Sequence, residues 1–185
     1  ELISKIEQES EISIDTETSS LDPHQAELIG ISISTKIGEA YYIPLNHKNF
    51  KNLMEKNVIK KLQNILEDKS IKKIGQNIKF DYIILYHRGI DLEPLEDTML
   101  MSYVLDAGKN RHNMDTLSEI HLGHKTISYK DLVGSGKKQI NFSEVKIEVA
   151  KDYAAEDADI TFRLYKKFLT NLKNEKLMNI YETFE

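Results

Sequence analysis

Near its N-terminus the chain alternates apolar with polar or small residues in three segments, 11–18, 28–34 and 39–45. An alternation with a period of two is typical of β-strands that bury one face. Residues 36–38, Lys-Ile-Gly, separate the second and third segments and are suited to a turn. The pattern therefore predicts a three-stranded antiparallel meander.

Helical periodicity dominates the rest of the chain, in the segments 58–68, 77–89, 97–108, 114–123 and 142–172. A short strand is predicted at 71–75, with Asn77 as the N-cap of the helix after it. Ser143 is expected to open the long last helix, and the Gly- and Lys-containing segment 126–142 reads as an irregular surface excursion. Strands that alternate with helices favour a mixed sheet with helices on both faces.

The first predicted strand carries acids in an unusual place. A period of two puts Ile12 and Ile14 on one face and Ser13, Asp15 and Glu17 on the other. An amphipathic strand with its polar side in water would explain most of this pattern. It does not explain two carboxylates side by side, because Asp is disfavoured in strands and like charges repel. Asp15 and Glu17 are therefore candidate functional residues.

The long last helix contains a second anomaly. Its apolar stripe, at spacings of about four, consists of Val149, Tyr153, Ile160, Leu164 and Phe168. Asp157 falls inside this stripe, whereas Asp152 and Asp159 are predicted on the solvated side. An acid that faces a core costs several kcal/mol unless it is paired or bound to metal. Asp157 is therefore either a buried, hydrogen-bonded aspartate or a metal ligand, and Tyr153 shares its face one turn away.

A fourth acid, Asp81, lies about one turn into the helix that begins near Asn77, where the helix dipole alone could explain an acid. Carboxylates that converge from a strand and two helices would repel each other unless divalent cations neutralised them. Ligand sets made only of oxygen select Mg²⁺ or Mn²⁺ over zinc. Two such ions about 4 Å apart can clamp the attacking and leaving oxygens of a phosphodiester, and a phenol beside them can hold the attacking water.

Composition narrows the class of protein. The chain has 185 residues and no cysteine, which indicates one domain without disulfides or thiolate zinc sites. The absence of cysteine favours a cytoplasmic setting, and without a signal peptide or membrane span we expect a soluble protein. We also expect a monomer. The net charge is -5, and only three of 25 basic residues are arginine. This balance argues against a protein that wraps long nucleic acid and leaves open one that holds a chain end.

Three motifs carry a resemblance to a known family. They are SIDTETSSLD (13–22), GQNIKFD (75–81) and YAAEDAD (153–159), and the intervening segment 111–128 is also similar. Together they resemble the proofreading exonuclease domain of bacterial DNA polymerase I, in the tyrosine-bearing branch of the DEDD superfamily. The resemblance implies a ribonuclease H-like three-layer α/β/α domain with a mixed five-stranded sheet. It also implies a 3′-5′ exonuclease that releases nucleoside 5′-monophosphates from single-stranded or frayed DNA.

The resemblance assigns roles to the acids and the tyrosine. The family's residue at Asp15 bridges two divalent cations, and those at Glu17 and Asp157 complete the first metal site. The residue at Asp81 supports the second ion through water. Tyr153 matches the tyrosine that orients the nucleophilic water. None of these five positions is substituted, so the resemblance implies an active enzyme with Mg²⁺ or Mn²⁺ as cofactor.

The family's DNA contacts carry over to further positions. Leu21 matches a leucine that wedges against the terminal bases, with a core leucine as the alternative. The polar residues that match positions near the 3′-terminal nucleotides are Gln76, Asn77 and Arg111. Phe80 stands where a tyrosine occurs, and Tyr129 stands where a phenylalanine stacks on a base.

Two other functions stay open at this point. A ribonuclease D-like RNA exonuclease uses the same tyrosine motif, and a catalytically silent module could bind nucleic-acid ends. Because the chain begins with Glu1, we expect a single domain, 1–185, cut from a longer protein. In that parent chain the polymerase domain, absent here, would be its partner, and single-stranded DNA 3′ ends its substrate.

Overall fold

A mixed five-stranded sheet with the strand order β3-β2-β1-β4-β5 lies at the centre of the protein. The computed structural model describes residues 1–184, so the last residue of the predicted domain 1–185 lies outside the described part. The strands are β1 (Glu11–Thr18), β2 (Leu28–Lys36), β3 (Glu39–Pro44), β4 (Lys72–Gly75) and β5 (Leu95–Asp97). β1, β2 and β3 pair antiparallel, which confirms the meander, and β4 and β5 continue the sheet in parallel. The sequence pattern does not locate β5, which is only three residues long.

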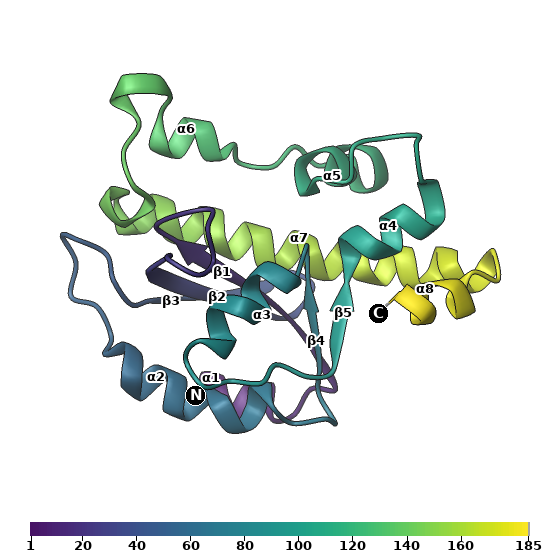
Figure 1. Cartoon of the computed structure of the whole chain (residues 1–185), viewed down its shortest axis with the longest axis horizontal. Helices are drawn as coiled ribbons and strands as arrows, with labels where there is room; N and C mark the ends of the chain where they lie inside the picture. The colour runs from purple at the N-terminus through teal and green to yellow at the C-terminus, as the bar shows by residue number, and fades with distance from the viewer. Residues whose placement is uncertain (185) are drawn as a thin grey trace.

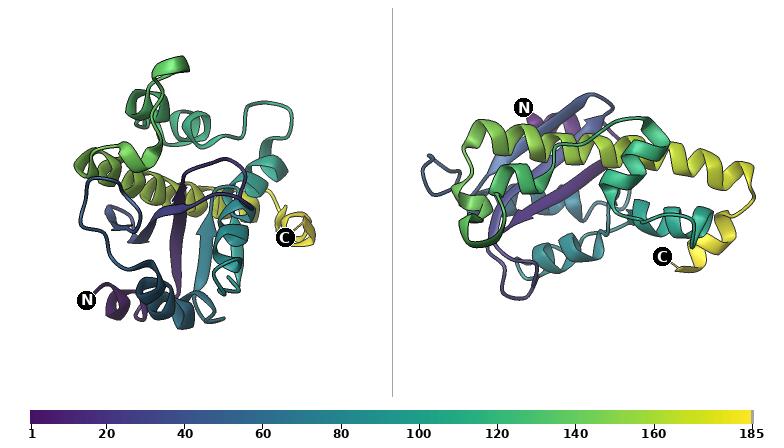
Figure 2. Two further views of the ribbon diagram at one scale, coloured as in Figure 1. Left: turned by 60° about the vertical axis from the view of Figure 1, so that its left-hand side comes forward. Right: turned by 90° about the horizontal axis from the view of Figure 1, so that it is seen from above.

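Helices cover both faces of this sheet. They are α1 (Leu2–Ile6), α2 (Glu55–Leu66), α3 (Lys79–Tyr86), α4 (Thr98–Asp106), α5 (Met114–Leu122), α6 (Tyr129–Val133), α7 (Ile147–Asn174) and α8 (Met178–Phe184). Figure 1 shows α7 along one face and α1 and α2 at the other, which is the predicted three-layer arrangement. The segment with α5 and α6 lies on the outer side of α7 in Figure 1 and in the left view of Figure 2. Within residues 1–184, none of the helices has the length and apolar character that a membrane span requires.

The sheet face toward α2 carries large aliphatic side chains. Ile12 and Ile14 of β1 are fully buried on this face, beside Ile31 and Ile33 of β2. Leu62 of α2 packs in the same cluster. Full burial of one such side chain stabilises a fold by about 1.5–3 kcal/mol, so this face supplies a large share of the stability.

The face under α7 is built from small residues instead. Ser13, Ser32 and Ser34 of the strands are fully buried there, as are Ala154 and Ala158 of α7. The Ser13 hydroxyl donates a hydrogen bond of 2.6 Å to the carbonyl oxygen of Ala158. Because these side chains are short, α7 lies close to the sheet. The residues of α7 next to Ala154 and Ala158 therefore lie directly over β1.

The long helix begins later than the periodicity predicts. A 3-10 turn at Phe142–Glu144 precedes α7, and the chain between the two is extended. Asn141 caps this turn by accepting a hydrogen bond from the amide of Ser143, so the prediction of one helix over 142–172 opened by Ser143 is wrong at its start. Val149 lies within α7 but is 45% exposed, so its predicted place in the buried apolar stripe is wrong.

The predicted cap of α3 is also wrong. Asn77 has a φ of 58°, in the left-handed region, and α3 is preceded by Ile78 in helical conformation. The amides of Asn77 and Ile78 donate to the carboxylate of Asp97, at 3.0 and 3.2 Å. The Asp97 carboxylate, which is distant in sequence, therefore accepts from the backbone amides that precede α3. This is the capping role predicted for the Asn77 side chain.

Candidate active site

Carboxylates from β1 and α7 meet above the small-residue face of the sheet. Asp15, Glu17 and Asp157 each place one oxygen within 4.8 Å of the other two. Asp15 and Glu17 share a face because side chains alternate along a strand. Asp157 immediately precedes Ala158, whose carbonyl is bonded to β1, so the close packing of α7 brings it onto the strand.

Asp81 of α3 is held beside this cluster by β1. Its Oδ1 accepts hydrogen bonds from the backbone amide of Thr16 at 2.8 Å and from the Thr16 hydroxyl at 2.5 Å. Burial raises the pKa of Asp81 well above its usual range, and the charge of Asp15 raises it further. Asp81 therefore interacts electrostatically with the cluster, although it lies outside the group of Asp15, Glu17 and Asp157.

Burial governs the charge state of the cluster. It raises the pKa of Asp15 to about 6. Burial also raises the pKa of Glu17 well above its ordinary value, followed by the charges of Asp15, Asp157 and Asp81. Burial likewise raises the pKa of Asp157, and the charge of Asp15 raises it further. Without a counter-charge, the carboxylates therefore bind protons far more readily than ordinary acids do.

The donors fit a divalent cation. The buried Oε1 of Glu17 has no hydrogen-bond partner among residues 1–184. Such an oxygen is costly unless a cation or donor satisfies it. Asp15, Glu17 and Asp157 offer oxygen ligands alone, the chemistry that Mg²⁺ and Mn²⁺ prefer.

Tyr153 lies one turn before Asp157 on α7, and the two side chains are close enough to shift each other's pKa. Burial raises the pKa of Tyr153, and the charges of Asp157, Glu17 and Asp15 raise it further. The phenol therefore keeps its proton at neutral pH, and its oxygen can accept a hydrogen bond.

A groove of about 680 Å³ opens onto the carboxylates. The predicted site residues that line it are Asp15, Glu17, Leu21, Gln76, Asn77, Phe80, Asp81, Tyr129, Tyr153 and Asp157. Arg111 does not line the groove; it is exposed in the loop before α5. The structure thus brings together residues from four distant segments and leaves one predicted contact outside.

Leu21 lies at the rim of the groove in the loop between β1 and β2. Its side chain is 95% exposed, so the alternative of a core leucine is wrong. Asp22 braces the loop by accepting from the amide of His24 at 3.0 Å, and ring nitrogens of His24 and His87 lie 3.0 Å apart. An apolar side chain held out on a braced loop is available to a ligand.

Aromatic and amide groups form the walls. Tyr129 begins α6, a helix inside the segment predicted to be irregular, and its ring stacks on Phe142 with centroids 6.2 Å apart. The Gln76 amide donates to the carbonyl oxygen of His112 at 2.8 Å and accepts from the Thr98 hydroxyl. The side chain of Gln76 is therefore fixed rather than mobile at the edge of the groove.

Sequence reasoning missed two positioning residues, Thr16 and Asp97. Thr16 holds Asp81, and no local pattern distinguishes it from other strand threonines. Asp97 orders the Asn77 turn and also accepts from the amide of Met99 at 2.8 Å, as an N-cap of α4. An Asp at the start of a periodic segment is a recognised cap signal and could have identified Asp97.

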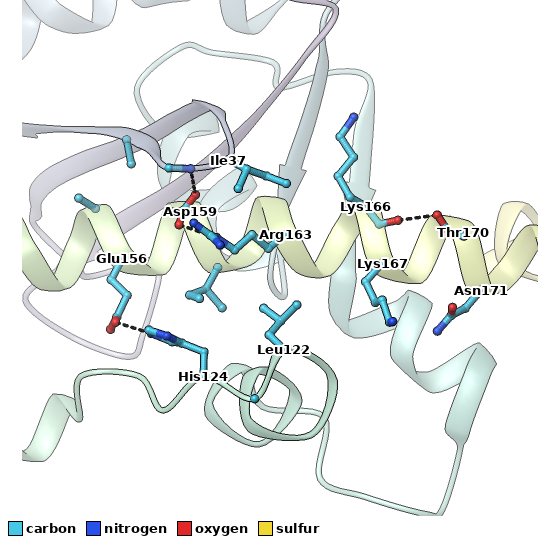
Figure 3. Close-up of a pocket in the computed structure, with 15 residues that line it drawn as sticks. Ile37, Leu122, His124, Glu156, Asp159, Arg163, Lys166, Lys167, Thr170 and Asn171 are labelled. Atoms are coloured by element: carbon cyan, nitrogen blue, oxygen red, sulfur yellow. Dashed lines mark hydrogen bonds and ion pairs between the residues drawn. The ribbon is translucent and has the colours of Figure 1, made fainter.

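A larger hollow of about 910 Å³ lies across α7 from this groove, between the β2–β3 turn and the end of α5 (Figure 3). Basic side chains line this hollow, but they do not converge on one point. Arg163 pairs with Asp159 at 2.7 Å, and Asp159 also accepts from the amide of Gly38, so the prediction of a simply solvated Asp159 is wrong. Figure 3 shows Lys166 and Lys167 leaving α7 on opposite sides. Among residues 1–184, the group of acids that could share a metal ion lies at the smaller groove.

Residues 1–173 match the sequence model of the 3′-5′ exonucleases. The chain belongs to the 3′-5′ exonuclease family. Its relatives include DNA polymerase I of Borreliella burgdorferi, 45% identical over the whole chain, and DNA polymerase I of Rhizobium leguminosarum, 43% identical over 94% of it. The exonuclease chain spans 20% and 19% of those two proteins. The predicted resemblance to the exonuclease domain of bacterial DNA polymerase I is confirmed.

Solved structures of other nucleases share the fold of this exonuclease. Brucella melitensis NrnC superposes with a TM-score of 0.75 and 26% identity, over 95% of this chain and 80% of that one. A structure of NrnC with bound Mg²⁺ matches at a TM-score of 0.74 and 27% identity. Escherichia coli RNase D matches at 0.72 over 97% of this chain and 44% of that one, with 17% identity, and supports the fold alone. The predicted ribonuclease H-like α/β class is confirmed.

Proposed function

We propose that this exonuclease domain hydrolyses the 3′-terminal phosphodiester bond of single-stranded or frayed DNA and releases nucleoside 5′-monophosphates. It does so with two divalent cations, Mg²⁺ or Mn²⁺. In its parent protein it removes misincorporated nucleotides beside a DNA polymerase domain of the same chain, in the cytoplasm and as a monomer. The observation that carries the proposal is the cluster of Asp15, Glu17 and Asp157 around an unpartnered buried oxygen.

The acids of the cluster have distinct tasks in this proposal. Asp15, Glu17 and Asp157 would hold one cation, and Asp15 with Asp81 would hold the other. When bound, the cations neutralise the carboxylates and stabilise the attacking and leaving oxygens of the phosphodiester. Thr16 keeps Asp81 in place through two hydrogen bonds, so the position of Asp81 is set by β1.

Tyr153 orients the attacking water in this scheme. The phenol lies near Asp157 and keeps its proton, so its oxygen would accept a hydrogen bond from the water and direct the water's lone pair toward phosphorus. Its raised pKa makes it a poor general base. Its contribution is therefore one of orientation, which is smaller than that of a metal ligand.

The groove suits a chain end rather than a duplex. Leu21 and Tyr129 present exposed apolar and aromatic surface at its rim, on which splayed bases can pack. A net charge of -5 leaves little general attraction for long nucleic acid. Paired ends must therefore fray before the last nucleotide can reach the acids.

RNA is the second candidate substrate, favoured by the structural likeness to NrnC, one structure of which is described as bound to pGG. The relatives that are DNA polymerase I, at 43% and 45% identity, favour DNA. A time course on 5′-labelled single strands of DNA and RNA of one sequence, with Mg²⁺, Mn²⁺ or chelator, separates the two. We expect a one-nucleotide ladder on DNA that disappears with chelator. Faster degradation of the RNA strand would overturn the DNA assignment, and no mononucleotide with either metal would overturn the nuclease assignment.

A further inference from the structure

A second tyrosine, Tyr42, packs against the same cluster around Phe142 as Tyr153 does. Tyr42 of β3 lies across Gly30 of β2, and Gly30 is the register partner of Glu17. A Cβ on Gly30 would stand 2.2 Å from the Tyr42 hydroxyl oxygen, so that oxygen occupies the space where a side chain at position 30 would begin. Directly opposite side chains in an antiparallel pair start about 4.5–5.5 Å apart. The Tyr42 hydroxyl is therefore a lateral neighbour of the Glu17 side chain.

His47 fixes this hydroxyl. Its Nε2 lies 2.7 Å from the Tyr42 oxygen, and its ring is buried against Phe142 with centroids 5.8 Å apart. Burial lowers the pKa of His47, so the ring is neutral at neutral pH, and its buried Nδ1 has no hydrogen-bond partner among residues 1–184. The contact with Nε2 and the packing of the His47 ring against Phe142 hold the Tyr42 oxygen in place.

We infer that Tyr42, fixed by His47, is a positioning residue for the Glu17 carboxylate, an inference that rests on the proposed metal-dependent function. The Tyr42 ring and its oxygen close off the β2 side of Glu17. The carboxylate is thereby kept among Asp15 and Asp157, with its buried Oε1 left for a cation.

The β2 strand makes room for this arrangement in two ways. Gly30 has no side chain, which allows the Tyr42 ring to cross the strand. The β1–β2 register also shifts beside Glu17, where one step along β1, from Glu17 to Thr18, matches two steps along β2, from Gly30 to Leu28. Bulges of this kind re-aim neighbouring side chains and are frequent beside active sites. The local irregularity therefore has a use that a regular ladder would not provide.

The experiment compares Tyr42→Phe, His47→Asn and the double variant with wild type. Mn²⁺ binding is measured by calorimetry and electron paramagnetic resonance, and the Mg²⁺ concentration for half-maximal DNA hydrolysis is measured in parallel. We expect each single variant to lower the Mn²⁺ affinity by ~10 to 100-fold, as is usual for residues that orient a metal ligand. The Mg²⁺ concentration for half-maximal hydrolysis should rise by the same factor. The rate at saturating Mg²⁺ should fall much less. The double variant should bind Mn²⁺ no more weakly than either single variant, because both changes remove the same Tyr42–His47 interaction.

Tyr41→Phe is the matched control. Tyr41 is the preceding residue on β3, and its hydroxyl bonds to Lys5 and Glu39 on the other face of the sheet. This variant should bind Mn²⁺ as wild type does. Folded Tyr42→Phe and His47→Asn proteins with wild-type Mn²⁺ affinity, or additive losses in the double variant, would overturn the inference. A wild type that binds Mn²⁺ but hydrolyses no nucleic acid would instead overturn the proposed function, and the Mn²⁺ affinities would still decide the role of Tyr42.

Discussion

The two faces of the sheet do different work. Toward α2, Ile12 and Ile14 build a dry aliphatic layer whose members could exchange with other large apolar residues. Under α7, Ser13 and Ala158 are small enough for a backbone carbonyl to bond directly to a strand hydroxyl. The first face provides stability, whereas the second sets the distance between a helix and a strand. A site that needs Asp157 within reach of Asp15 depends on the second face.

The largest effect is expected from Asp157→Ala, which removes one of the three clustered carboxylates. Hydrolysis should fall by at least ~1000-fold, on the scale of losing a major electrostatic element of a transition state. Folding should survive, because the change removes a buried charge. Asp152→Ala, on the same helix with an exposed side chain, serves as the control and should retain full activity. Near-normal cleavage by a folded Asp157→Ala protein would show that the carboxylate cluster is not the active site.

The aliphatic face should respond in the opposite way. Leu62→Ala in α2 should lower the free energy of unfolding by about 2–5 kcal/mol, the usual range for a buried leucine. Its hydrolysis rate, measured well below the unfolding temperature, should stay unchanged, because Leu62 lies in the core on the face of the sheet away from the carboxylates. Denaturant unfolding and a rate assay at the same temperature check both halves. A large loss of rate without loss of stability would mean that the two faces are not separable.

Tyr153→Phe tests the smaller contribution of orientation. The hydrolysis rate should fall by ~10 to 1000-fold, one hydrogen bond's share of transition-state stabilisation. Mn²⁺ affinity should be nearly unchanged, because the phenol is not a ligand in the proposal. Tyr86→Phe, which alters an exposed tyrosine of α3, controls for the loss of a hydroxyl. A Tyr153→Phe rate equal to that of wild type would reduce Tyr153 to a core residue.

The rim of the groove should contribute least. Tyr129→Ala should weaken binding of a single strand by ~5 to 150-fold, the factor that a stacking energy of roughly 1 to 3 kcal/mol implies. Single-stranded and mismatched 3′ ends should be cut faster than matched duplex ends, because only frayed ends enter. Tyr86→Ala is the control for an exposed tyrosine outside the groove. Equal rates on all three substrates, or no loss of binding in Tyr129→Ala, would contradict this account of substrate capture.

The spacing of apolar residues predicts where strands and helices occur better than it predicts where each one begins and ends. The meander, the strand at 71–75 and the anomaly at Asp157 follow from alternation and helical spacing, which are local properties. The start of α7 and the turn at Asn77 depend on Asn141 and Asp97, whose partners are set by the tertiary fold. Likewise, no spacing in the sequence indicates that Tyr42 crosses Gly30.

The convergence of the acids was expected from chemistry and motif similarity, and the structure adds how it is held. Alternation puts Asp15 and Glu17 on one face, but the packing that brings Asp157 to them requires small residues on two elements far apart in sequence. Arg111 shows the limit of motif matching, because its match places it near the substrate and the structure leaves it outside the groove. Its role in DNA binding stays a prediction.

Thermal unfolding at pH 5 and pH 8, with and without Mg²⁺, tests most directly whether the clustered carboxylates are a cation site. The pKa of Asp15 rises from 3.8 to about 6 on folding, so the stability linked to it is present below pH 4 and is lost as the pH rises through 6. The raised pKa values of Glu17, Asp81 and Asp157 act in the same direction.

The metal-free exonuclease should therefore lose stability between pH 5 and pH 8 relative to Asp157→Ala. Mg²⁺ should raise the unfolding temperature of wild type at pH 8, much less at pH 5, and little in the variant, because cations bind only the ionised carboxylates. An Mg²⁺ effect at pH 8 that is absent, or equal in wild type and Asp157→Ala, would contradict the account.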